Sequence, residues 1–374
     1  YNYTDGTQAK WDVSDTTTQE WTMWDTINTS AFVEYNYVFA NAWQLQASYN
    51  FRGFEEQDKL FYASGSIDKD TNLGLSGWPG RYDSEVDADL FEVKAFGAFE
   101  LFGKEHQASF GVSHAKSDDV MYQHPFDFAN TSAAGSTPAF PYDLDAIPEP
   151  DWLTPVLYSD IEQKLTRYFG SAQLNITDKL FTVVGFNAIE FERSGMNAGA
   201  SIDNDESETS PYIGFTYKLN DDLNLYASYS DIYQPQEQAD YNGQYLAPTK
   251  GTNFETGVKA SWFDDALMTT FAYFTAEQDN FAQYAGLTED GIYYYEGVSI
   301  ESEGYEFEVT GKITDAMNIV ASYAHIDVTD ENGDDTNKWA PRDVVGVTVD
   351  YALTDALVVG LNGRWQSKIE STDY

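Results

Sequence analysis

The chain has 374 residues, and 62 acidic side chains against 20 basic ones give it a formal net charge of -42. This charge excludes nucleic acid as an expected partner, because phosphate binding requires basic patches. The chain contains no cysteine, which excludes disulfides, thiolate chemistry and zinc–cysteine sites.

Aromatic residues make up 16% of the chain, with 27 Tyr, 24 Phe and 9 Trp. The mean hydropathy is -0.47, and no run of about 18 apolar residues could form a membrane-spanning helix. A membrane β-barrel remains compatible with these values, because only alternate residues of its strands face lipid and aromatic girdles mark both lipid interfaces.

Strands are indicated in chain order by alternation of apolar and polar residues. In the segment 43–52, Trp, Leu, Ala, Tyr and Phe fall on one face and Gln, Gln, Ser, Asn and Arg on the other. The segments 212–219, 223–229 and 357–366 repeat this alternation. We expect about fourteen strands, at residues 22–38, 43–56, 86–102, 105–118, 161–175, 180–194, 209–219, 222–234, 253–262, 267–280, 300–311, 317–328, 342–352 and 357–368.

Short connections alternate with long ones along the chain. The short ones hold Asn, Asp or Gly and predict tight turns, at 39–42, 102–105, 176–179, 219–222, 263–266, 313–316 and 353–356. The long ones are rich in Gly, Pro, Asp and Tyr and cover about 66–85, 119–160, 195–210, 235–252, 281–299 and 329–341. Short periplasmic turns with long outer loops are typical of bacterial outer-membrane barrels. The fold class predicted is therefore all-β, a transmembrane antiparallel up-and-down barrel.

Catalytic and metal-binding patterns are not found in the sequence. The four histidines, His106, His114, His124 and His325, have no metal-ligand spacing, so we expect structural roles for them. The sequence has no nucleophile-elbow motif and no Gly-rich phosphate loop. We expect no catalytic residue, no metal ligand, no covalently bound cofactor and no enzyme activity. The acidic runs at 203–206 and 330–335 are expected in solvated loops, with divalent-ion bridging to lipopolysaccharide as a minor alternative.

Six segments between about residues 209 and 368 carry a more specific signal. They are Tyr229–Gln236, Leu246–Pro248 with Gly251–Lys259, Phe263–Leu267, Phe274–Asn280, Glu303–Glu308 and Arg364–Ser367. In this order and spacing they resemble strand and turn signatures of TonB-dependent ferric-siderophore receptors. The part of the chain before about residue 209 is similar only in its succession of strands, turns and loops.

The resemblance implies a barrel of 22 strands in the bacterial outer membrane, closed by a plug domain. We expect residues 1–374 to form a partial barrel of about 14 strands without the plug, the energy-coupling box or the final strands. The expected function is TonB-coupled uptake of a ferric siderophore, which is the transported ligand. Expected partners are the TonB-ExbB-ExbD complex, reached through the plug, and outer-membrane lipid and lipopolysaccharide. The isolated piece is expected not to function, because open strand edges in lipid are costly.

Aromatic residues near the expected outer strand ends are the candidate ligand contacts, since flat apolar walls with a few polar groups suit a rigid iron chelate. The substrate-binding candidates are Trp78, Tyr82, Tyr122, Phe126, Trp152, Gln234, Gln236, Tyr241, Tyr245, Tyr284 and Tyr294, with Phe128, Tyr293 and Tyr295 beside them. The alternative role of the aromatic residues is in the interfacial girdle and in loop packing. Arg52, Arg193 and Arg364 are expected in the lumen, where pairing with carboxylates or a plug is favoured over contact with an anionic chelate.

Two functions of other classes remain open. A passive porin would need a complete barrel of about 16–18 strands and a constriction loop, and an adhesin-like barrel would bind another macromolecule through its loops. A coding sequence for a plug upstream would separate the receptor from the porin. All three readings require the apolar strand faces to meet lipid, and two stacked sheets with a dry centre would contradict them.

Overall fold

The computed structural model describes residues 2–289 and 292–370, so residues 290 and 291 of the expected loop at 281–299 lie outside the described residues. The strands are β1 (Met23–Val38), β2 (Gln44–Gly65), β3 (Leu75–Leu101), β4 (Lys104–Gln123), β5 (Gly135–Ser136), β6 (Val156–Asn175), β7 (Leu180–Asn197), β8 (Ala200–Lys218), β9 (Leu223–Gln234), β10 (Thr249–Trp262), β11 (Leu267–Leu287), β12 (Tyr293–Thr314), β13 (Met317–Asp330), β14 (Asp343–Thr354) and β15 (Leu357–Gln366).

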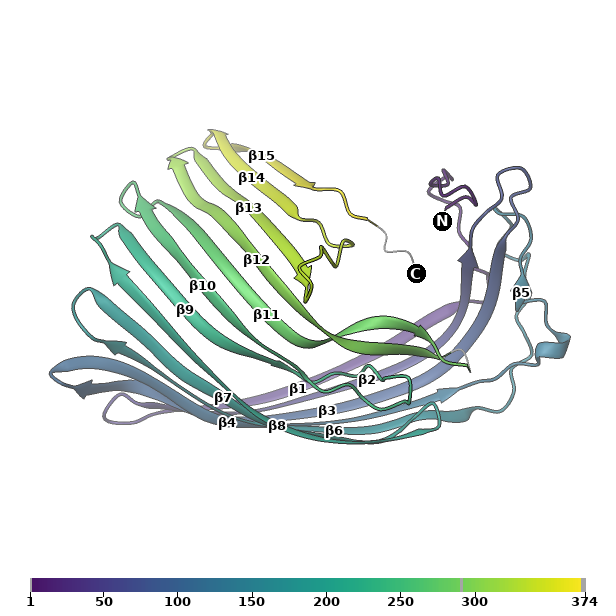
Figure 1. Ribbon diagram of the computed structural model, residues 1–374, viewed down its shortest axis with the longest axis horizontal. Helices are drawn as coiled ribbons and strands as arrows, with labels where there is room; N and C mark the ends of the chain where they lie inside the picture. The colour runs from purple at the N-terminus through teal and green to yellow at the C-terminus, as the bar shows by residue number, and fades with distance from the viewer. Residues whose placement is uncertain (1, 290–291, 371–374) are drawn as a thin grey trace.

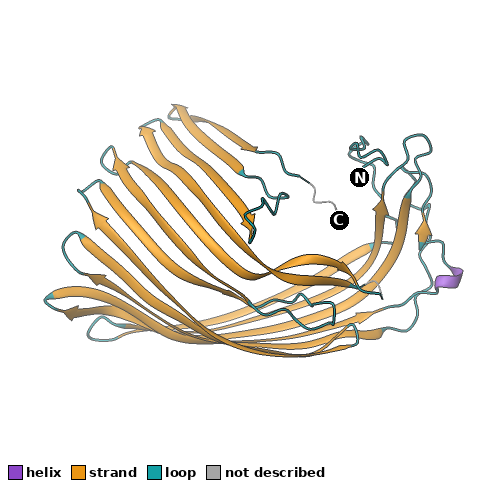
Figure 2. Ribbon diagram, in the orientation of Figure 1, coloured by secondary structure: helices purple, strands orange, loops and turns teal. Residues whose placement is uncertain are grey.

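All of these strands belong to one antiparallel sheet. Each long strand pairs with the next one along the chain, and the short β5 pairs with β3. The sheet curls into an open trough with the tight turns at one end and the longer loops at the other (Figure 1). Figure 2 shows that strands dominate throughout. The fourteen predicted strands are confirmed, and β5 is an addition that the sequence did not predict.

The seven predicted short connections are confirmed as tight links between consecutive strands. The link from β3 to β4 is the clearest, because Phe102 and Gly103 alone separate the two strands and have φ angles of 54° and 73°. Two consecutive positive φ angles match the twist of a hairpin, which is why a glycine suits the second position.

Three of the predicted long loops are wrong. The expected loop at 195–210 is reduced to Ala198 and Gly199, and the expected loops at 66–85 and 281–299 are largely paired strand. The acidic run at 203–206 therefore lies in β8, not in a loop. Outside the membrane both faces of a strand meet water, so the alternation that marks strands disappears while backbone pairing continues.

The remaining connections at this end are true loops. Residues 124–155 hold β5 and the short 3-10 turn η1 (Phe128–Asn130), and residues 235–248 and 331–342 join later strands. The predicted acidic loop at 330–335 is confirmed, since the Asp330 carboxylate caps it by accepting from the Asn332 and Asp334 amides, each at 2.9 Å. No helix among the described residues is long and apolar enough to cross a membrane.

Cross-strand register separates the sheet into two chemically distinct faces. One row of neighbours on the apolar face is Tyr35, Ala47, Val93, Val112, Tyr168 and Ala188. The adjacent row on the polar face is Glu34, Ser48, Glu92, Ser113, Arg167 and Ile189. The apolar face stays open, as Leu361 of β15 illustrates with 70% exposure. The strands form a single sheet, which contradicts a two-layer sandwich and fits an apolar face turned to lipid.

A small buried core lies at the loop end, not between layers. It consists of Ile67, Leu75 and Phe140, with Tyr3, Trp11 and Tyr142 packed around it. The segment 2–22 is tied to the 124–155 loop by the Trp21 indole, which donates to the Ile147 carbonyl at 2.9 Å. The Gln19 side-chain oxygen accepts from the Ile147 amide at 3.0 Å. These contacts give the loop end a fixed shape.

Candidate functional site

The first set of predicted aromatic residues gathers where the 124–155 loop meets β3. The Trp78 and Phe126 ring centroids lie 5.2 Å apart, and those of Phe126 and Trp152 lie 6.3 Å apart. Trp21 and Phe61 extend this cluster. We call it the tryptophan group, and its members are Trp21, Phe61, Trp78, Phe126, Phe128 and Trp152. Trp78 remains 50% exposed, so a flat ligand could reach it.

An isolated β-bridge and an ion pair hold the tryptophan group in place. Phe126 and Trp152 form an isolated antiparallel bridge within the loop. The Trp152 indole donates to the Glu149 carboxylate at 2.7 Å, and the Lys59 ammonium lies 2.7 Å from the same carboxylate. Burial alone would raise the pKa of Glu149, but hydrogen bonds from Lys59 and Trp152 outweigh it and hold that pKa below its ordinary value.

The second set forms where the 235–248 loop meets the β11–β12 hairpin. The Tyr241 and Tyr294 rings meet edge to face with centroids 5.1 Å apart, and the Tyr284 ring lies 5.6 Å from Tyr293 and 6.2 Å from Tyr295. The Tyr295 amide donates to the Ala239 carbonyl at 2.9 Å, which joins hairpin and loop. We call Tyr241, Tyr284, Tyr293, Tyr294 and Tyr295 the tyrosine group. Two further aromatic candidates, Tyr82 and Tyr122, lie on the neighbouring strands β3 and β4. Tyr82 pairs with Gln123 on the polar face, whereas Tyr122 pairs with Asp83 on the opposite face.

The two glutamines that flank Pro235 have different surroundings. Gln236 is 8% exposed, and its amide nitrogen donates to the carbonyls of Ala247, at 2.5 Å, and Asn280, at 2.6 Å. Its side-chain oxygen accepts from the Ala282 amide at 3.1 Å. Gln236 therefore anchors both ends of the 235–248 loop to β11, whereas Gln234 is exposed.

Arg193 of β7 lies beneath the same loop on the polar face. Its side chain is only 7% exposed, and one guanidinium nitrogen lies 3.5 Å from the Glu237 carboxylate. The guanidinium carbon lies 5.3 Å from the centroid of the Tyr245 ring, a cation–π arrangement. Arg193 thus contacts residues near both ends of the loop, a burial that the sequence did not reveal.

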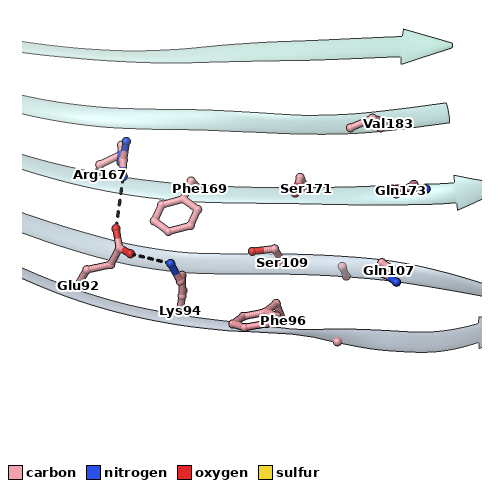
Figure 3. Close-up of a pocket in the computed structure, with 12 residues that line it drawn as sticks. Glu92, Lys94, Phe96, Gln107, Ser109, Arg167, Phe169, Ser171, Gln173 and Val183 are labelled. Carbon is pink, nitrogen blue, oxygen red and sulfur yellow. Dashed lines mark hydrogen bonds and ion pairs between the residues drawn. The ribbon is translucent and has the colours of Figure 1, made fainter. Parts of the chain in front are cut away.

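The polar face lower in the trough carries a second arginine site. Glu92 lies between Lys94 and Arg167, each 3.5 Å away, as the dashed lines in Figure 3 show. The Arg167 guanidinium also lies 4.9 Å from the Phe169 ring. These side chains line a cavity of ≈ 690 Å³, whose wall also holds Phe96 and small or amide side chains such as Ser109.

The other predicted lumenal arginines also lie on polar faces. Arg52 lines a cavity of ≈ 330 Å³ together with Leu90, Leu165 and Phe191, and Arg364 lies opposite Gly346 in the last strand pair. The histidines bond to neighbouring protein groups, as His124 does to Asp83 at 2.7 Å. Among residues 2–289 and 292–370, no group of His, Cys, Asp and Glu could hold a metal ion.

Comparison with known proteins identifies this arrangement. Residues 1–374 match the family described as TonB dependent receptor-like, beta-barrel. The chain belongs to this family. The expected resemblance is confirmed, and the sheet is part of an outer-membrane β-barrel.

Relatives of this barrel family include receptors from several bacteria. The ferripyoverdine receptor of Pseudomonas aeruginosa is 28% identical over 93% of this chain and 43% of its own length. The ferrioxamine B receptor of Salmonella typhimurium is 25% identical over 88% of this chain and 46% of its own length. The chain therefore spans less than half the length of these curated relatives.

A solved structure agrees with the observed fold. The pyoverdine outer membrane receptor of Pseudomonas aeruginosa, bound to pyoverdine, superposes with a TM-score of 0.87 at 26% identity. The match covers 98% of this chain and 54% of the solved chain.

Proposed function

We propose that the chain forms part of the barrel of a receptor that takes up ferric siderophores across the outer membrane with energy supplied through TonB. The observation that carries the proposal is the pair of aromatic groups at the loop end of a polar-lined trough. Relatives named for ferripyoverdine and ferrioxamine B support it, because they align over about nine-tenths of the chain.

The proposed ligand site is the vestibule, by which we mean the space at the loop end bordered by the tryptophan and tyrosine groups. Rigid aromatic walls bury a flat chelate at little cost in side-chain entropy. We propose ligand contacts for Trp78, Tyr82, Phe126, Trp152, Gln234, Tyr241, Tyr245, Tyr284 and Tyr294. Tyr122 is left out, because its pairing with Asp83 places it on the outer face of the sheet. Gln236 is proposed to position the loop, because its amide is already bonded to the backbone.

The remaining parts of the proposal concern partners and domains. We propose that residues 1–374 act only as barrel, and that the TonB-ExbB-ExbD complex acts through a plug outside this chain. Lipid and lipopolysaccharide would surround the apolar face. The ligand passes through chemically unchanged, so the protein is proposed to be no enzyme. A passive porin or an adhesin has less support, since the relatives are named as receptors.

Growth and binding measurements test the proposal. A strain lacking the full-length receptor should lose growth on its cognate ferric siderophore as sole iron source, with ferripyoverdine and ferrioxamine B as the first compounds to try. The purified full-length receptor should bind the same compound, and uptake should stop when TonB is deleted. Solute entry that continues without TonB, or failure to bind any ferric siderophore, would contradict the proposal.

A further inference from the structure

Arg193 has unmet hydrogen-bonding capacity in a buried position. Its side chain is 7% exposed, yet Nε and Nη1 have no hydrogen-bond partner among the residues that the structure describes. A guanidinium carries five N–H donors in a rigid fork, and buried donors without partners are costly. Its ionic contact with Glu237, at 3.5 Å, is longer than a good charge-assisted hydrogen bond of about 2.7–2.9 Å.

Glu237 is poorly suited to be the permanent partner of this arginine. Glu237 belongs to the 235–248 loop and its side chain is 67% exposed, so water competes with Arg193 for its carboxylate. The neighbouring Gln236 is bonded to the backbone on both sides. The Glu237 side chain can therefore turn outward while the base of the loop stays fixed.

Other groups partly compensate the buried charge of Arg193 when the Glu237 side chain turns outward. Asp119 of β4 is a second carboxylate whose charge acts on the same guanidinium. The Tyr245 ring covers one face of the guanidinium at 5.3 Å. Gln163 and Asn204 are the cross-strand neighbours of Arg193 on β6 and β8. The N–H edge of the Arg193 guanidinium therefore remains available to a planar anion.

We propose that Arg193 and Tyr245 form an anion subsite of the vestibule, and that Glu237 is its internal competitor. The subsite would take a carboxylate, or a similar planar two-oxygen anion, of the incoming ferric chelate through paired hydrogen bonds to the guanidinium. The aromatic groups contact the body of the chelate, and this subsite recognises its negative charge. The inference rests on the proposed function for its ligand, but its chemistry can be tested without one.

Titration of succinate into the full-length receptor tests the subsite directly. Glu237→Gln removes the competing charge and should tighten succinate binding about tenfold relative to the wild type. Adding Arg193→Gln to that variant should abolish the gain, and Arg193→Lys should recover only part of it, because lysine lacks the fork. Succinamide should bind equally weakly to all variants.

Arg167→Gln in the Glu237→Gln background is the matched control, and it should leave succinate binding unchanged. Resistance of the barrel to unfolding in detergent gels checks that every variant is folded. Equal succinate affinity in the wild type, Glu237→Gln and the double variant would overturn the subsite.

A second titration separates this inference from the proposed function. Ferrioxamine B capped on its amine with a succinyl group is anionic, and the acetyl-capped form is neutral. Glu237→Gln should favour the succinyl form over the acetyl form about tenfold more than the wild type does. If the receptor takes up no ferric siderophore but succinate binding still depends on Arg193, the proposed function is contradicted and the anion subsite is supported. If ferric chelates bind but their charge preference does not depend on Arg193, the anion subsite is contradicted and the proposed function is not.

Discussion

The vestibule and the channel wall contain the same arrangement in two different surroundings. Arg193 and Arg167 lie on adjacent strands, each 3.5 Å from a carboxylate and each about 5 Å from an aromatic ring, at 5.3 Å and 4.9 Å. Their exposure differs, at 7% for Arg193 and 42% for Arg167. The channel arginine is partly exposed, with only Nε buried and without a partner among the described residues, and it has a second cation beside its partner. The vestibule arginine is enclosed by a loop.

Because the pairing geometry of the two sites is alike, we expect their access to water to decide what each contributes to stability. Charge pairs in contact with water contribute about 0–1 kcal/mol, because solvent and salt screen them. A buried cation is costly unless it is fully paired. The Arg193 site therefore responds to which anion is present, while the Arg167 site contributes mainly polarity to the wall of the trough.

The largest effect is expected at the anchor that encloses the vestibule site. Gln236→Ala leaves two carbonyls and one amide without their partner, which should make opening of the 235–248 loop easier by about 2–3 kcal/mol. Hydrogen exchange of the loop amides measures this opening. Gln234→Ala is the control and should change exchange little, and equal effects of the two substitutions would show that the loop is not anchored through Gln236.

A smaller effect is expected for Trp78, an aromatic residue of the vestibule. Trp78→Leu should weaken binding of the cognate ferric siderophore by about 1–2 kcal/mol, because a flat ring is lost from the vestibule. Phe169→Leu makes a comparable change in the channel wall and should leave equilibrium affinity unchanged. Titration of the full-length receptor gives both values, and a larger loss with Phe169→Leu would place the binding site lower in the trough.

Removal of the two carboxylates compares the arginine sites directly. Glu237→Ala leaves a buried guanidinium with less compensation and should destabilise the loop by about 1 kcal/mol. Glu92→Ala should cost less, and its cost should fade at high salt. Denaturant unfolding and hydrogen exchange at two salt concentrations measure both. Equal costs with equal salt dependence would remove the distinction between the sites.

The smallest effect concerns the tip of the vestibule loop. The pKa of Asp240 is held below its ordinary value, first by the backbone hydrogen bond from Gln244 and then by bonds from Asn242. A lowered folded-state pKa means that this cap stabilises the tip above the unfolded pKa and is lost as pH falls through the folded one. The protection factor of the amides at residues 242–244, which is the intrinsic exchange rate divided by the observed rate, should fall on acidification, and Asp240→Asn should remove most of that dependence. An unchanged pH profile in the variant would contradict the cap.

Much of the fold could be predicted from the sequence, because alternation and tight-turn residues are local signals. The segment 223–229 and the turn at 102–105 fall where expected. The alternation of apolar and polar residues did not predict the parts of the strands that extend beyond the membrane. The segment 203–206 carries charges on both faces, so its sequence predicts a loop, although β7 pairs with it throughout. Pairing there is set by the register that begins lower in the hairpin, which no local pattern reports.

The candidate site was predictable only as a set of residue types. The sequence pointed to Trp78 and Trp152 but not to Trp21 or Phe61, which distant packing brings to them. Phe61 fits because Gly77 has no Cβ, which would lie 2.4 Å from the ring. Arg193 was predicted as lumenal, but its burial depends on how the 235–248 loop folds back over it.

The two-residue link at Ala198 and Gly199 gives the β7–β8 hairpin a practical consequence. Both residues are exposed, with φ angles of 50° and 82° that a tight turn requires. Exposed turns between well-paired strands are where inserted sequence is best tolerated. A foreign peptide spliced between them would be held by a paired hairpin, which makes this turn a natural position for an epitope tag or for surface display on living cells.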